Sequence, residues 1–120
     1  MDANELVKRY LDTWNERDAE ARRAGLAEIW TDGGSYVDPL AVARGRDAID
    51  ATIAGAQQMF PDLRFRLAGV VDAHHNLARF TWELGPDGGE AVVVGFDVAV
   101  LSEDGRLREV HGFLDKVPAH

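Results

Sequence analysis

The first half of the chain repeats apolar residues with the period of amphipathic helices. Between Asn4 and Asn15 they fall at spacings of one, three and four, which is the stripe of a helix with one buried face. A second helix is predicted from Asp18, whose side chain can cap the first N–H groups, to about Trp30, before an Asp-Gly-Gly turn at residues 32–34. Residues 46–59 predict a third helix that stops before the next proline.

The second half of the chain alternates with the period of β-strands. Strands are expected over residues 63–72, 77–84, 90–101 and 107–117, because turn sequences rich in Gly, Asn and Asp separate these segments. A shorter extended segment, Ser35 to Asp38, ends at a proline. Helices followed by a strand meander indicate an α+β fold, a curved antiparallel or mixed sheet with three N-terminal helices, in a single domain over residues 1–120.

The strand predicted over residues 90–101 is apolar on both faces. Alternation assigns one face to Val93, Gly95, Asp97, Ala99 and Leu101, and the other face to valines and Phe96. The helices and a pocket can cover only one side of this sheet, so the other side needs a different cover. We therefore expect a homodimer formed through the sheet.

The charge of the chain narrows the choice of partners. Thirteen basic and twenty-one acidic residues give a net charge of −8, which repels phosphate backbones and anionic lipid headgroups. We therefore expect neither nucleic acid nor a membrane as a partner. The polar beginning of the chain lacks the plan of a secretory signal, and a cytoplasmic location is the default expectation.

Three residues are candidates for chemistry on their own merits. Asp97 is the strongest, because an ionised carboxylate among valines is costly unless it is paired, hydrogen-bonded or neutralised. An edge position or a bond to a nearby backbone group would explain it equally well without a function. Asp38, at a strand end, can point into a cavity but also suits an ordinary turn. Tyr10 can bring a hydroxyl into a pocket or simply fill the core.

Short motifs follow one another in order along nearly the whole chain. After two helices come Y-V-D-P at residues 36–39, G-R-D-A-I at 45–49, P-D-L-R-F at 61–65 and D-G-R-L-R-E-V-H-G-F at 104–113. This order resembles the nuclear transport factor 2 superfamily, in particular its SnoaL-like and ketosteroid isomerase-like branches. The resemblance implies a cone-shaped sheet around a pocket, in a fold that hosts enzymes, binding modules and transport factors.

The resemblance to the ketosteroid isomerases also implies roles for the three candidates. Their proton-shuttling carboxylate lies in a segment like Y-V-D-P, which makes Asp38 the candidate base. Their oxyanion hole combines a tyrosine of the first helix with a protonated aspartic acid of the long apolar strand, which match Tyr10 and Asp97. In SnoaL-like cyclases, Asp97 or Asp38 could act as the acid–base residue. No metal or organic cofactor is implied.

The aromatic residues depart from the isomerase pattern. The resemblance implies that Trp30 and Ile53 stand where the isomerases commonly have further tyrosines that support the oxyanion tyrosine, so a reduced hydrogen-bond network is expected. Bulky rings narrow the cavity and imply a substrate smaller or flatter than a steroid. The residues expected to contact the substrate are Trp14, Trp30, Phe80, Trp82 and Leu114.

The resulting expectation is a small-molecule enzyme of the isomerase or polyketide cyclase kind. It would transfer a proton next to a carbonyl group of a hydrophobic substrate without a cofactor. The alternative is a non-catalytic module of the same fold that binds a hydrophobic ligand or dimerises. Among the histidines, His74 and His75 belong to a turn rather than a metal site, and His111 faces either the cavity mouth or the dimer interface.

Overall fold

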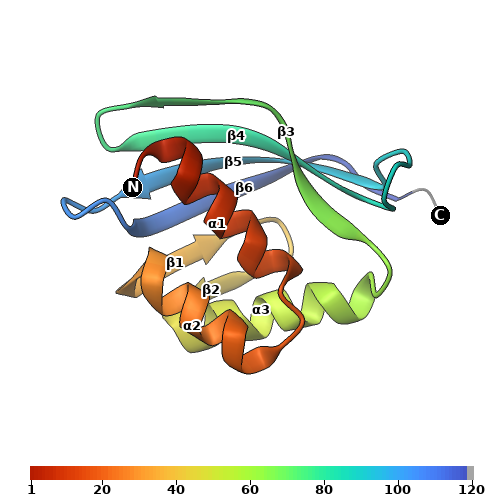
Figure 1. Cartoon of the computed structure of the whole chain (residues 1–120), viewed down its shortest axis with the longest axis horizontal. Coiled ribbons are helices and arrows are strands. Elements are labelled where there is room, and N and C mark those ends of the chain that lie inside the picture. The colour runs from red at the N-terminus through yellow and green to blue at the C-terminus, as the bar shows by residue number, and fades with distance from the viewer. Residues whose placement is uncertain (119–120) are drawn as a thin grey trace.

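The computed structural model describes residues 1–118 and places three helices against one face of a six-stranded sheet (Figure 1). The helices are α1 (Ala3–Asn15), α2 (Ala19–Ile29) and α3 (Arg46–Met59). The strands are β1 (Trp30–Val37), β2 (Val42–Arg44), β3 (Arg64–His74), β4 (Leu77–Gly85), β5 (Val93–Leu101) and β6 (Leu107–Lys116). The predicted α+β architecture is therefore confirmed.

The helices begin where the sequence provides caps. The carboxylate of Asp2 accepts a hydrogen bond from the backbone N–H of Glu5 at 2.8 Å, and Asp18 caps α2 in the same way. α3 follows Gly45, whose φ of +85° is a conformation that a residue without a side chain adopts easily. The apolar stripe of α1 is buried against the sheet, and it carries Tyr10 and Trp14 into the core.

The strand order β2-β1-β6-β5-β4-β3 brings together segments that lie far apart in the sequence. β1 pairs with β6 in parallel, and every other neighbouring pair is antiparallel. In this register Val37 lies beside His111, while Gly112 lies beside Asp97 of β5. The end of β1, with Asp38 just beyond it, therefore lies level with the middle of β5, and β6 lies between the two strands.

Two features of the N-terminal part of the sheet differ from the sequence-based expectation. β1 runs from Trp30 through the two glycines that we expected to form a turn, and the short strand β2 was not predicted. The register of β1 against β6 shifts between Trp30 and Ser35, so the glycines form an irregularity within the strand. A Cβ at Gly34 would lie 2.5 Å from Cε3 of the Trp30 ring, so the ring occupies the space that a side chain would need.

The two faces of β5 are used as the alternation predicts. Val93, Asp97 and Ala99 are buried toward the helices. The opposite face carries an apolar patch, which we call the outer patch, and no helix of residues 1–118 covers it (Figure 1). The outer patch consists of Val94, Phe96, Val98, Val100 and Phe113.

None of the three helices is long and apolar enough to cross a membrane, as far as residues 1–118 are concerned.

We propose that a second copy of this chain covers the outer patch. Charges of both signs flank it, including Arg79 and Glu109, so a two-fold symmetric contact can pair opposite charges. Sedimentation at micromolar concentration should give twice the monomer mass of 13.2 kDa. Phe113→Glu, which places a charge at a residue that is 57% exposed in the single chain, should give a monomer.

The matched control for this experiment is Val42→Glu. Val42 is also an exposed apolar residue, but it lies on β2 at the edge of the sheet and outside the outer patch. This variant should remain dimeric. A monomeric unsubstituted protein, or equal dissociation of both variants, would contradict the proposed dimer.

Candidate functional site

A cavity of about 540 Å³ lies between the helices and the face of the sheet that they cover. Its wall is mostly apolar, and α3 contributes small residues such as Ala51, Gly55 and Ala56 that leave room for a ligand. Aromatic rings from α1, β3 and β4 line the sides. Among the lining residues that the structure describes, the acidic side chains are Asp38 and Asp97, and there is no Lys, Arg or His.

Asp97 is the more deeply buried of the two acids, with 2% of its surface exposed. Its Oδ2 accepts a hydrogen bond from the hydroxyl of Tyr10 at 3.3 Å, and its Oδ1 is buried without a hydrogen-bond partner among residues 1–118. Burial, together with the charge of Asp38, raises the pKa of Asp97 from 3.8 to about 7, although the neighbouring Trp82 and Tyr10 side chains oppose the rise. Near neutral pH this carboxyl can therefore either hold or release a proton.

Tyr10 keeps its proton throughout this range. Burial and the nearby Asp97 charge raise the pKa of its hydroxyl well above the ordinary value of 10.0. The hydroxyl therefore acts as a hydrogen-bond donor rather than as an anion.

Asp38 is half-buried and more fully hydrogen-bonded. Its Oδ1 accepts the backbone N–H groups of Leu40 and Ala41, each at 2.8 Å, and its own N–H donates to the carbonyl of Ala41 at 3.0 Å. Its Oδ2 accepts the hydroxyl of Tyr36 at 2.5 Å. These three donors hold the carboxylate in one orientation at the end of β1.

The two acids come together over Gly112 of β6. A Cβ at this glycine would lie 2.9 Å from Oδ1 of Asp97, 3.3 Å from Cβ of Asp38 and 3.6 Å from the hydroxyl oxygen of Tyr36. The missing side chain thus provides the space in which all three groups meet. Any larger residue at this position would displace the carboxyl of Asp97.

Three of the five residues expected to contact a substrate line the cavity. They are Trp14, Trp82 and Leu114. The indole of Trp82 lies over Gly95, where a Cβ would come within 2.0 Å of the ring, so this glycine permits the ring to lie flat on β5. The indole nitrogen Nε1 of Trp14 is buried without a hydrogen-bond partner.

The other two expected substrate contacts, Trp30 and Phe80, do not line the cavity. Trp30 is 0% exposed and Phe80 is 2% exposed, and both rings pack against Tyr10, at centroid distances of 6.4 and 5.8 Å. Alternation correctly predicts that Phe80 points from β4 toward the helices. The ring of Tyr10, however, packs against the Phe80 ring on that face of the sheet. Both residues therefore pack around Tyr10 in the core, behind the cavity wall.

The three histidines within residues 1–118 do not line the cavity. His111 is exposed on the outer face of β6, where its Nε2 lies 2.9 Å from Oε1 of Glu109. His74 and His75 stack edge to face at the β3–β4 turn. Within residues 1–118, no group of three or more His, Asp or Glu side chains is arranged to hold a metal ion.

Sequence reasoning assigned no role to Tyr36 or Gly112. The signal for Tyr36 was present, because residues two apart in a strand share a face, and Asp38 follows Tyr36 by two positions. Gly112 could not be recognised in the same way. Its importance depends on the pairing of β6 with both β1 and β5, which no local pattern reveals.

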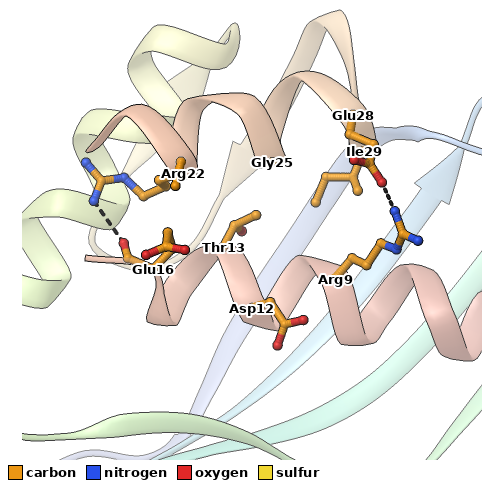
Figure 2. A pocket seen from close by; sticks show the side chains of 9 residues that line it. Arg9, Asp12, Thr13, Glu16, Arg22, Gly25, Glu28 and Ile29 are labelled. Carbon is orange, nitrogen blue, oxygen red and sulfur yellow. Dashed lines mark hydrogen bonds and ion pairs between the residues drawn. The ribbon is translucent and has the colours of Figure 1, made fainter. Parts of the chain in front are cut away.

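A second, shallower hollow of about 240 Å³ lies between α1 and α2 (Figure 2). At one end Arg9 pairs with Glu28, and at the other Arg22 donates to the backbone carbonyl of Glu16 at 3.1 Å. Arg22 also pairs with Asp50 at 2.6 Å. Because these charged groups already have partners within the fold, we assign no function to this hollow.

The burial of Asp97 predicts an unusual dependence of stability on pH. Folding raises the pKa of this carboxyl from 3.8 to about 7. Its contribution to the free energy of unfolding is therefore fully present at a pH below the pKa of the unfolded chain, and it is lost as the pH rises through the folded value of about 7. In the isosteric variant Asp97→Asn the side chain cannot ionise, so its stability does not fall with pH in this way. In urea unfolding, the two proteins should have similar stability near about pH 4, and at about pH 8 the variant should be more stable by up to about 4 kcal/mol. A difference that stays constant with pH would contradict the raised pKa.

Comparisons with known proteins agree with this architecture. The sequence matches the family model of the SnoaL-like domain over residues 7–110. A solved structure from Agrobacterium tumefaciens strain C58, a proposed isomerase of the SnoaL-like family, is 43% identical, with a TM-score of 0.88 over 92% of this chain and 95% of that chain. No curated protein matches the chain.

More distant structures share the fold alone. A SnoaL-like protein of unknown function from Burkholderia thailandensis E264 is 18% identical, with a TM-score of 0.73 over 93% of each chain. A proposed SnoaL-like polyketide cyclase from Jannaschia sp. CCS1 is 20% identical, with a TM-score of 0.72 over 92% of this chain and 83% of that chain. The family match over most of the sequence and the similarity to the Agrobacterium protein show that this chain belongs to the SnoaL-like family.

Proposed function

We propose that this protein catalyses proton transfer next to the carbonyl group of an uncharged hydrophobic substrate, by acid–base chemistry that needs no cofactor. The observation that carries the proposal is the pair of carboxyls over Gly112, which lie side by side in one apolar cavity but in different environments. Neighbouring acids whose environments separate their proton affinities are suited to separate acid and base roles.

Asp38 is the proposed base. A carboxylate offers about four lone-pair sites, and three of those of Asp38 are used, two on Oδ1 and one on Oδ2. One site on Oδ2 is therefore left to accept a proton. In the proposed step, the C–H bond next to the carbonyl breaks, its proton moves to Oδ2 of Asp38, and its electron pair forms the enolate. The proton then returns to a different carbon or to the same one.

Tyr10 and protonated Asp97 are the proposed donors to the enolate oxygen. The Tyr10 hydroxyl has one proton, which would turn from Oδ2 of Asp97 to the enolate oxygen when the substrate binds. The hydroxyl of Tyr10 stays protonated, and Asp97 holds its proton below about pH 7 because burial disfavours its charge. The unpartnered Oδ1 of Asp97 is available for such a contact. A preorganised donor of this kind contributes about 3 kcal/mol to the stability of the transition state.

The lining of the cavity supports an uncharged substrate. Within residues 1–118 it includes no basic side chain that could neutralise a carboxylate or phosphate group, and an anion would be repelled by Asp38. The names of two similar structures, a proposed isomerase and a proposed polyketide cyclase, agree with carbonyl chemistry of this class. A flat, bicyclic ketone is therefore a suitable probe.

The proposal can be tested without knowing the natural substrate. β-Tetralone is apolar and uncharged and has an acidic C–H next to its carbonyl, so the protein should accelerate its exchange with deuterium oxide above the buffer rate. The exchange is followed by proton NMR. Asp38→Asn should reduce the acceleration by about 100-fold or more, because the amide cannot accept the proton. Asp115→Asn, at an exposed carboxyl of β6 outside the cavity, should have no effect.

A binding measurement separates catalysis from simple ligand binding. β-Naphthol resembles the enol of β-tetralone, and its binding can be followed by the fluorescence of the cavity tryptophans. Binding of β-naphthol without any accelerated exchange would replace the enzyme with the alternative, a protein that binds a hydrophobic ligand. Exchange that survives in Asp38→Asn would show that Asp38 is not the base.

A further inference from the structure

Tyr36 is a buried titratable residue that the proposed reaction does not use. The chain has only two tyrosines, and the hydroxyl of each donates to one of the two cavity carboxyls. Tyr10 from α1 donates to Asp97, whereas Tyr36 from β1 donates to Asp38. This one-to-one arrangement suggests that each carboxyl is controlled by its own phenol.

The position of Tyr36 is fixed by packing on both sides. Its side chain is 3% exposed, and its ring lies 5.4 Å from the ring of Trp14, measured between centroids. Its hydroxyl lies in the space above Gly112, between the strands that carry the two acids. The hydroxyl therefore has little freedom to turn away from Asp38.

We propose that Tyr36 is the positioning residue of Asp38, and that its hydroxyl occupies one lone-pair site of Oδ2 so that the remaining site faces the cavity. This inference rests on the proposed function in one respect, because it takes Asp38 as the base. The two backbone N–H groups hold Oδ1, whereas Tyr36 donates to Oδ2 and completes the set that orients the planar carboxyl group. Within residues 1–118, Tyr36 is the hydrogen-bond donor on the oxygen that would receive the proton.

Tyr36 acts purely as a donor in this role. Burial, together with its bond to Asp38, raises the pKa of its hydroxyl far above the ordinary value, so the hydroxyl keeps its proton during the reaction. The proton that leaves the substrate therefore stays on Asp38 rather than passing through the phenol.

Few other ionisable groups face the pair formed by Tyr36 and Asp38. Tyr10 from α1 and Asp97 from β5 do so, whereas the lining residues of α3, β4 and β6 are not ionisable. A change in exchange rate caused by removing the Tyr36 hydroxyl can therefore be assigned to its contact with Asp38. The variant Tyr36→Phe keeps the ring that packs on Trp14 and removes the hydroxyl alone.

The first experiment detects the hydrogen bond directly and needs no substrate. A short bond from a buried hydroxyl to a carboxylate should give a slowly exchanging proton NMR resonance far downfield of the amides. This resonance should be lost in Tyr36→Phe and retained in Tyr10→Phe, the matched control that removes the other buried phenol. Its absence from the unsubstituted protein, or its survival in Tyr36→Phe, would overturn the inference.

The second experiment measures the effect on the base. In Tyr36→Phe, Oδ2 of Asp38 loses its orienting donor, so the rate of β-tetralone exchange should fall by about tenfold. The affinity for β-naphthol should change by less than about twofold, because the ring that packs on Trp14 is kept. Tyr10→Phe should instead weaken β-naphthol binding, because it removes a donor to the ligand oxygen. An unchanged exchange rate in Tyr36→Phe, or a loss of β-naphthol affinity as large as the loss of rate, would overturn the inference.

The two experiments keep this inference separate from the proposed function. If the unsubstituted protein exchanges no β-tetralone, the proposed reaction fails, and the downfield resonance alone decides whether Tyr36 holds Asp38. If exchange occurs and depends on Asp38 but not on Tyr36, the proposed reaction stands and the role of Tyr36 is wrong.

Discussion

The arrangement of this protein depends on one constraint, the burial of the Asp97 carboxyl opposite a glycine. β5 needs an apolar inner face to pack against the helices, and a charge there is costly. Gly112 on the neighbouring strand leaves the space into which that carboxyl extends. The same space admits the end of β1, because β6 pairs with β1 on its other side. A single missing side chain therefore brings two acids and a phenol into one place.

The two acids face the same cavity but differ in how they are solvated. Asp38 receives three hydrogen bonds that replace water around an ionised group. Asp97 receives one long bond from Tyr10 and leaves Oδ1 unpartnered, so its neutral form is favoured by burial. The difference arises from the backbone: a turn at a strand end offers free N–H groups, whereas the middle of a paired strand offers none.

The sequence predicted the fold and the candidate acids better than the walls of the cavity. Periodicity located the three helices and the strands from β3 onward, because those elements have regular alternation. It missed β2 and the start of β1, where glycines accommodate the ring of Trp30. It also placed Trp30 and Phe80 in the cavity, because alternation gives the face of a side chain but not its neighbours across the core. The role of Gly112 arises only from strand pairing.

The aromatic core offers a physical reason why Tyr10 can be positioned without further tyrosines. The rings of Trp30, Phe80 and Trp14 surround its ring at centroid distances of 5.8 to 6.4 Å. Close packing of this kind fixes a ring as firmly as hydrogen bonds do, because a displaced ring would leave a void. The arrangement leaves the indole nitrogens of Trp14 and Trp30 buried without partners. Packing thus takes the place of a polar network around the Tyr10 hydroxyl. The ionisable groups of the described cavity wall are then the two acids and the two phenols that donate to them.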